Sequence, residues 1–270
     1  MFPRRIALLI SSWMGVVAFH AAVDARRLTL ANLTLVYGDE KSRREINKMG
    51  RTVFRELGRN VVDAVRLPSI TVENVDTLVT IEGLEHLELA YQKGRGVIAV
   101  SAHLGNFELL GSVLALKGFA VTVVAAPVYD SRLDELLMQH RVQSGLTVVN
   151  RDQAFAILRA LKKGDIVGLL VDQYTRGSAI DVPFFGMPAR TPIGPAILAG
   201  RVGAPIIPMA IRRQSDDTHF ITIRPPLYSV GRSHENVEML TAAYTEELER
   251  FIRKAPAQWL WMHDRWKVPR

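Results

Sequence analysis

The strongest constraint on the fold is an alternation that begins near Thr77 and continues through most of the chain. Short apolar runs typical of buried strands, such as 97–102 and 166–171, are separated by segments whose apolar residues recur at helical spacing. Connections between them are short. This pattern predicts an α/β fold in which a mostly parallel central sheet is covered by helices.

The predicted elements can be assigned along the whole alternating region. Strands are expected at 78–81, 97–102, 120–126, 146–149, 166–171 and 205–211, with helices at 84–92, 108–116, 130–143, 152–162 and 193–202. The segment 181–192 is dense in proline and aromatic residues, and it is predicted to be a loop that leads into the last of these helices.

The amino-terminal part is predicted to be a helical extension. Its only long apolar segment, Ile6 to Val23, has about eighteen residues, which is near the lower limit for spanning a bilayer. It is flanked by arginines on both sides, and a signal anchor, a cleaved signal peptide and an amphipathic helix lying on the membrane all remain open. We therefore divide the chain into a membrane-associated helix, 1–24, and a single α/β domain, 25–270, whose front part, 25–70, is helical.

A long helix is expected after Ser42, because Ser42 and Glu45 have the spacing of a capping box. One face carries an apolar stripe formed by Ile46, Met49, Val53, Leu57, Val61 and Val65. The other face carries cations at Arg43, Arg44, Lys48, Arg51, Arg55 and Arg59. Such a face is suited to an anionic surface.

Composition narrows the possible chemistry. The chain of 270 residues has no cysteine, which excludes disulfides, thiolate nucleophiles and cysteine-ligated zinc. Its net charge of +7 favours an acidic partner, but no nucleic-acid-binding motif accompanies that charge, so no nucleic acid is expected. The histidines are scattered without a metal-binding motif, and we expect neither a metal nor a cofactor.

The best candidate for chemistry is the stretch Ser101-Ala102-His103-Leu104-Gly105-Asn106-Phe107-Glu108. His103 should follow a strand, at the carboxyl end where open α/β sheets bind ligands. Glu108, in the first turn of the next helix, is expected to reach back to the ring. A carboxylate there would fix the tautomer and leave the other nitrogen as a base.

Further candidates follow in the second half of the chain. Arg141 precedes a strand, and Asp172 with Gln173 ends the apolar run 166–171, again at a strand's carboxyl end. Taken singly, an aspartate after a strand is an ordinary turn former.

The stretch from His103 to Glu108 resembles the His-x4-Asp/Glu box of the lysophospholipid acyltransferase superfamily. The form His-Leu-Gly-Asn-Phe-Glu is similar specifically to the late (lauroyl/myristoyl-type) acyltransferases of lipid A biosynthesis. Arg141, Asp172-Gln173, the Phe-Phe-Gly loop of 181–192 and Pro205-Ile206-Ile207-Pro208 follow in the same order as that family's blocks. The closing segment 256–267 resembles its Pro-x-Gln-x-x-Trp signature, so the resemblance covers about Arg26 to Lys267.

The resemblance implies an acyltransferase that moves a fatty acyl chain from a thioester to a hydroxyl of a membrane glycolipid, most simply a lipid A precursor. His103 and Glu108 would be catalytic. The implied oxyanion or substrate contacts are Arg141, Asn106, Asp172, Gln173, Arg176 and Arg190, and the implied walls of an acyl channel are Phe184, Phe185 and Met187.

The same resemblance implies partners and a location. Acyl carrier protein or acyl-coenzyme A would be the donor, a membrane lipid the acceptor, and the cytoplasmic face of the cell inner membrane the place of work. Three other functions remain open: acyl transfer to a lysophospholipid or another glycolipid, thioester hydrolysis with the same residues, and lipid binding without catalysis.

Overall fold

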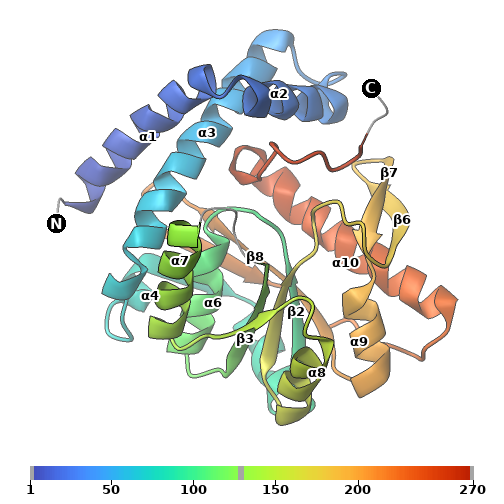
Figure 1. Ribbon diagram of the computed structural model, residues 1–270. Coiled ribbons are helices and arrows are strands. Elements are labelled where there is room, and N and C mark those ends of the chain that lie inside the picture. Colours follow the sequence, from blue (N-terminus) through green and yellow to red (C-terminus); the bar gives the residue numbers. More distant parts are fainter. Residues whose placement is uncertain (1–2, 127–130, 268–270) are drawn as a thin grey trace.

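The computed structural model describes residues 3–126 and 131–267, with the backbone alone for 131–133. It confirms the α/β alternation (Figure 1). The central sheet consists of seven strands: β1 (Val79–Glu82), β2 (Val97–Ser101), β3 (Val121–Ala125), β4 (Thr147–Asn150), β5 (Ile166–Leu170), β8 (Ile206–Arg213) and β9 (His219–Ile223).

The sheet is mostly parallel, as predicted. Its strand order is β1-β9-β8-β2-β5-β3-β4, and neighbouring strands run parallel except where β9 lies antiparallel to β8. Strand β2 is central, and all five of its residues are buried. A strand covered on both faces needs a continuous apolar run, which is the pattern found at 97–101.

Helices on both faces of the sheet form two hydrophobic cores. Alternate residues of β2 point to opposite faces, so Ile98 and Val100 join one core while Val97 and Ala99 join the other. The covering helices are α4 (Val75–Leu78), α5 (Leu84–Tyr91), α6 (Phe107–Leu116), α7 (Ser131–Gln143), α8 (Ala154–Lys163), α9 (Gly194–Val202) and α10 (His234–Lys254). Asp130, where helix α7 was predicted to begin, lies outside the described residues.

The segment predicted as a loop at 181–192 is instead a β-hairpin, and that prediction was wrong. Strands β6 (Ala179–Phe184) and β7 (Met187–Pro192) pair antiparallel, with Val182 and Phe184 buried on one face. The turn residues Phe185 and Gly186 both have positive φ, as a tight two-residue hairpin turn requires. The prolines are tolerated because this two-stranded ribbon consists only of edge strands.

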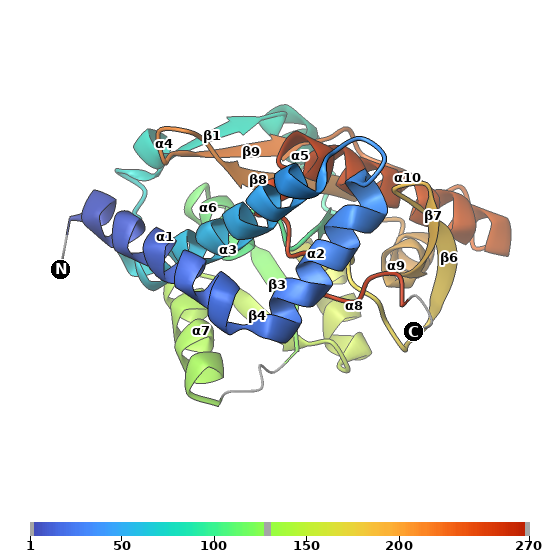
Figure 2. The ribbon, with the colours of Figure 1, turned by 90° about the horizontal axis from the view of Figure 1, so that it is seen from above.

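Three long helices form the amino-terminal part of the described chain: α1 (Arg4–Ala21), α2 (Val23–Tyr37) and α3 (Arg43–Val65). They lie together over the end of the sheet where β2 and β5 finish (Figures 1 and 2). The capping box is confirmed, since the Ser42 backbone N–H donates to Glu45 Oε2 at 2.9 Å and the Glu45 N–H donates to Ser42 Oγ at 3.4 Å.

The apolar stripe of α3 is buried only in part. Ile46 and Val53 lie in the core, but Leu57, Val61 and Val65 are exposed near the carboxyl end of the helix. Contiguous exposed apolar side chains of this kind are typical of binding surfaces.

Within the described part of the chain, no single helix is long and apolar enough to cross a membrane. Taken together, α1 and α2 meet that test of length and composition, and a bend of 92° separates them.

Candidate active site

Adjacent parallel strands bring His103 and Asp172 together. In the pairing of β2 with β5, Ser101 lies opposite Leu170, so the loops that leave these strands begin side by side. His103 Nδ1 lies 2.8 Å from Asp172 Oδ1, and the His103 backbone N–H donates to Asp172 Oδ2 at 2.9 Å. His103 therefore lies at the carboxyl end of its strand, as predicted.

Asp172 is buried and held by three donors. Only 1% of the residue is exposed, and the Trp259 indole Nε1–H donates to Oδ2 at 2.7 Å. Burial alone raises the pKa of Asp172, but the charge and hydrogen bond of His103 and the bond from Trp259 lower it below its ordinary value. A carboxylate only accepts, so His103 Nδ1 carries the hydrogen and Nε2 is the basic nitrogen.

The pKa of His103 is raised from its ordinary value of 6.5. Burial of the ring acts in the opposite direction, but the charge and hydrogen bond of Asp172, with a contribution from the charge of Glu108, outweigh it. The ring packs edge-on against Phe107 with centroids 5.0 Å apart, which restricts its rotation. These contacts give His103 the features of an oriented general base.

Glu108 does not hold the His103 ring, and that prediction was wrong. Its two carboxylate oxygens accept from Arg141, with Nε–Oε2 at 2.9 Å and Nη2–Oε1 at 2.6 Å. The Asn106 side chain caps α6, so Glu108 lies in the first turn, where the last turn of α7 presents Arg141. Asp172, expected to contact substrate, takes the orienting position instead.

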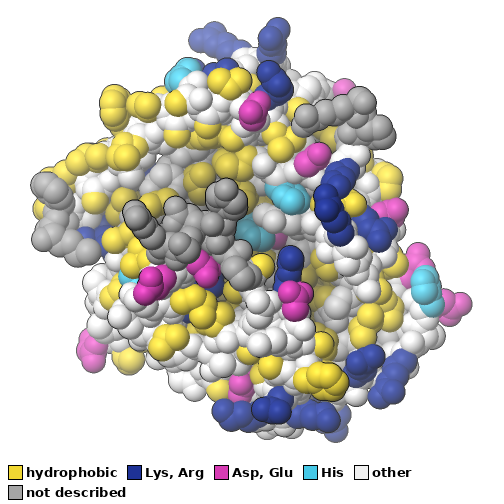
Figure 3. Space-filling model, in the orientation of Figure 1, with side chains coloured by type: hydrophobic (Ala, Val, Ile, Leu, Met, Phe, Trp, Pro, Cys, Tyr) yellow, Lys and Arg dark blue, Asp and Glu magenta, His cyan; other side chains and the backbone are white. Residues whose placement is uncertain are grey.

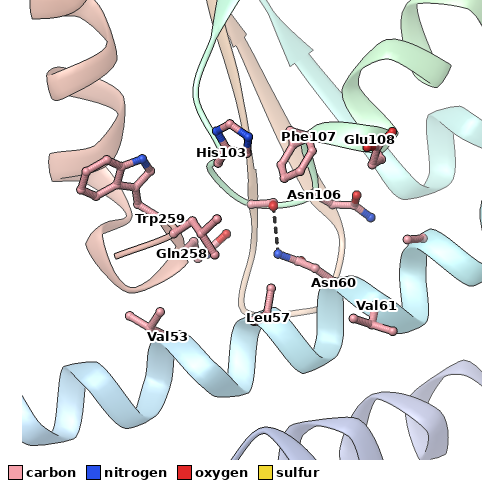
Figure 4. A pocket seen from close by; sticks show the side chains of 13 residues that line it. Val53, Leu57, Asn60, Val61, His103, Asn106, Phe107, Glu108, Gln258 and Trp259 are labelled. Atoms are coloured by element: carbon pink, nitrogen blue, oxygen red, sulfur yellow. Dashed lines mark hydrogen bonds between the residues drawn. The ribbon is translucent and has the colours of Figure 1, made fainter. Parts of the chain in front are cut away.

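His103 borders a pocket of about 150 Å³ between α3 and the loop after β2 (Figure 4). The lining is mainly apolar, with Asn60, Asn106, Glu108 and Gln258 as polar exceptions alongside His103. Asn106 Nδ2 is buried, and no hydrogen-bond partner is found for it among the described atoms. A buried donor of this kind gains free energy when a ligand atom accepts from it. The apolar part of the lining is Val53, Leu57, Val61, Ala64, Phe107, Trp259 and Leu260.

The loop that carries His103 is held through Gly105. Its N–H donates to the Gln258 carbonyl at 3.0 Å, and its carbonyl accepts from Asn60 Nδ2 at 2.8 Å (Figure 4). Gly105 has φ +55°, and a Cβ there would lie 2.3 Å from the Ile211 carbonyl oxygen. Only glycine fits this left-handed position and close approach.

A buried ionic network fixes the position of Asn60. Arg213 donates through Nη2 to Asn60 Oδ1 at 2.9 Å and through Nη1 to Asp63 at 2.6 Å. Asp63 also accepts from Arg4 Nε at 3.0 Å and lies 3.0 Å from His219 Nε2. Because these partners come from α1, α3, β8 and β9, the network ties the amino-terminal helices to the sheet beneath the active-site loop.

Three residues that hold the site in place, Asn60, Gln258 and Trp259, were not predicted from the sequence. Gln258 and Trp259 belong to the closing signature, so a signal for them was present. Asn60 gave none, because it is one polar residue on a helix rich in polar residues.

Three predicted contacts do not line the pocket beside His103. Gln173 and Arg176 follow Asp172 in its loop, and Arg190 is half-buried on β7, where its carbonyl accepts from Arg265 Nη1 at 2.5 Å. Among the described residues, the pocket lining includes none of the three.

The predicted acyl-channel residues belong to the core. Phe184 and Phe185 are buried against Trp259 at centroid distances of 5.7 and 6.4 Å, and Met187 packs on the same cluster. They pack against Trp259, and none of them lines the pocket beside His103, so their role as walls of an acyl channel stays a prediction.

Comparison with known proteins points to one family of enzymes. A sequence model of the family described as "Bacterial lipid A biosynthesis acyltransferase" matches residues 1–268. The Escherichia coli K12 lipid A biosynthesis palmitoleoyltransferase is 29% identical over 98% of this chain and 86% of its own length. The lauroyltransferase of the same pathway and organism is 25% identical over 98% and 87%. A phosphatidylinositol mannoside acyltransferase of Mycobacterium tuberculosis is 26% identical over 77% and 67%.

Proposed function

Because the chain belongs to the bacterial lipid A biosynthesis acyltransferase family, we propose that it transfers a fatty acyl chain from a thioester to a hydroxyl of a membrane glycolipid. The acceptor is a lipid A precursor, and the donor is acyl carrier protein or acyl-coenzyme A. The observation that carries this proposal is the pair of His103 and buried Asp172 beside an apolar pocket.

In this reaction His103 is the general base. Nε2 takes the proton of the acceptor hydroxyl while the oxygen attacks the thioester carbonyl carbon. The resulting imidazolium is stabilised by the charge of Asp172, as in other histidine-carboxylate sites. When the carbon–sulfur bond breaks, the proton passes from His103 to the departing thiolate, which restores the neutral ring and releases a thiol.

The developing oxyanion needs donors at the edge of the pocket. Arg141 is bonded there to Glu108, and the N–H groups of Phe107 and Glu108 begin α6 without intrahelical partners, whereas that of Leu109 already donates to Asn106 Oδ1. The Asn106 amide is a third candidate donor. Arg176 and Arg190 remain our candidates for the phosphates of an anionic acceptor, and Gln173 for another polar contact with it.

Location follows from the substrates. A glycolipid acceptor is embedded in a bilayer, whereas an acyl carrier protein is acidic and cytosolic. A protein of net charge +7 is attracted to both an anionic bilayer and an acidic carrier. We therefore place it at the cytoplasmic face of the inner membrane.

Acceptor dependence tests the proposal. With an acyl thioester, we expect transfer to a lipid A precursor in preference to a phosphatidylinositol mannoside or a lysophospholipid, and little thioester loss without acceptor. No cysteine is available as a nucleophile, so initial rates should follow a sequential pattern with both substrates bound. Equal thioester loss without acceptor would identify a thioesterase, and a ping-pong pattern would contradict direct transfer.

The pair of Glu108 and Arg141 should act as a unit. In Glu108→Gln, Arg141 loses the anion that holds it, and we expect kcat/KM to fall about 10–100-fold. Arg141→Gln should cost a similar factor, and the double variant little more than either single one. Glu246→Gln, which breaks the exposed pair with Arg250, is the matched control. Additive losses in the double variant would show that the two residues act separately.

A further inference from the structure

We infer that α1 lies flat in the surface of the bilayer, with one side inserted among the lipids and the other packed on α3. The inference rests on the proposed membrane acceptor. Of the three interpretations that the sequence leaves open for residues 6–23, the helix lying on the membrane is the one chosen. The open side of α1 is then the surface that contacts the bilayer.

The two sides of α1 differ in what they contact. Leu8, Ser11, Ser12, Gly15 and Phe19 are buried. The opposite side is apolar and open, with Leu9 72% exposed and Trp13 68% exposed. Ile6, Ile10, Met14 and Val17 extend this open side along the helix. Hydrophobic side chains gather over α1 and continue into the hollow beside it (Figure 3).

The buried side of α1 is fitted closely to α3. A Cβ on Gly15 would lie 2.3 Å from the Phe54 carbonyl oxygen, and one on Gly58 would lie 2.3 Å from the Ser11 carbonyl oxygen. Arg55 Nε also donates to Ser12 Oγ at 3.1 Å. Backbones that approach this closely through small residues form a specific seam, which α1 would lose if it stood upright in a membrane.

Both ends of α1 are attached to the rest of the same folded domain. At the amino end, Arg4 donates two bonds to buried Asp63, at 3.0 and 3.1 Å. At the carboxyl end the chain turns into α2, where Asn32 donates to the Trp261 and His263 carbonyls at 2.8 Å each. With its two ends fixed to one domain, α1 has both ends on one side of the bilayer.

Charge identifies lipid as the occupant of the open side. Arg5 is exposed at one end of α1 and Arg27 just beyond the other, while Arg51 of α3 is exposed alongside. An apolar helix face bordered by arginines and carrying a tryptophan is typical of helices that lie in an anionic membrane surface. A protein bound to this face would need acidic residues around its own apolar surface to pair with these arginines.

This orientation also explains the exposed part of α3. Leu57 and Val61 are exposed and line the pocket beside His103, and they belong to the helix on which α1 packs. With α1 at the lipid surface, the pocket opens next to the bilayer, and a glycolipid reaches it without fully entering water.

Single-cysteine labelling tests the inference, because the natural chain has no cysteine background. The full-length variants are Arg5→Cys and Ala22→Cys near the two ends, Leu9→Cys and Val17→Cys on the open side, and Lys163→Cys on α8 as the water-exposed control. Inside-out and right-side-out inner-membrane vesicles are treated with a membrane-impermeant maleimide.

We expect positions 5, 22 and 163 to label in the inside-out vesicles alone, and positions 9 and 17 to label at least about tenfold more slowly there. Labelling of positions 5 and 22 in opposite vesicle types would show a span and overturn the inference. Labelling of positions 9 and 17 as fast as position 163 would show that the face is in water and would also overturn it. Labelling needs no turnover, so its outcome is independent of the acceptor assay.

Discussion

The His103→Ala variant should lose acyl transfer by about 10³-fold or more while remaining folded. Among the described neighbours none presents a free base in its place: Glu108 stays paired with Arg141, Asp172 stays buried and bonded to Trp259, and His263 Nε2 accepts the Tyr174 N–H. Since the acceptor hydroxyl is a poor nucleophile without a base, the loss should appear in kcat as well as in kcat/KM.

Two measurements separate this loss from unfolding. Removing the ring leaves Asp172 Oδ1 without its partner, which costs about 1–3 kcal/mol, less than the free energy of unfolding of a typical domain. The thermal unfolding midpoint should therefore fall only moderately. His234→Ala, which removes an exposed histidine of α10, should retain full activity. Turnover by purified His103→Ala near the natural rate would refute the assignment of the base.

Asp172→Asn should lower kcat by about 10³–10⁴-fold, the effect that a misplaced ring proton has in histidine-based acyl transfer. Oδ2 accepts both the His103 backbone N–H and the Trp259 indole N–H, so the carbonyl oxygen of the new amide must take that place. Its NH₂ group then faces His103 Nδ1. That nitrogen must accept, the hydrogen moves to Nε2, and the base is lost.

The pH profile distinguishes this mechanism from general damage. His103 works as a base only when neutral, so activity falls as pH decreases through its pKa. Burial lowers that pKa, but Asp172 and Glu108 raise it above 6.5, and the acidic limb of kcat/KM in the natural protein should lie above this value. Without the charge of Asp172 the effect of burial is less opposed, and the limb of Asp172→Asn should move to lower pH.

The opposite end of the same strand provides a matched control. Asp165 directly precedes β5, is also buried, and accepts from Thr122 Oγ1 at 2.9 Å. Asp165→Asn removes a buried carboxylate without touching His103, so it should change stability more than activity and leave the pH profile in place. An unshifted acidic limb in Asp172→Asn, or an equal shift in Asp165→Asn, would contradict the proposed role.

The sequence by itself determined the fold class and the position of His103 at the end of a strand. Periodicity is a local property, so the apolar runs at 97–102 and 166–171 identified β2 and β5, and the spacing of Ser42 and Glu45 identified the start of α3. The rule that ligands bind at the carboxyl ends of strands then placed His103, and equally Asp172. The family resemblance supplied the chemistry.

The local sequence pattern gave a wrong prediction for residues 181–192, which form the β6–β7 hairpin. Proline and aromatic residues in 181–192 suggested a loop, yet Phe184 and Phe185 are buried by tryptophans from the end of the chain. A packing partner about eighty residues away leaves no trace in a short window of sequence.

Only the tertiary structure decided which carboxylate serves His103. The spacing within one stretch favoured Glu108, because sequence reveals neighbours along the chain. Strand order is set by how the whole sheet packs, and it places β5 beside β2 although they are far apart in sequence. That pairing places Asp172 on His103 Nδ1, while the last turn of α7 brings Arg141 to Glu108. These residues were visible in the sequence, but their partners depend on which strands and helices, far apart in the sequence, lie side by side in the fold.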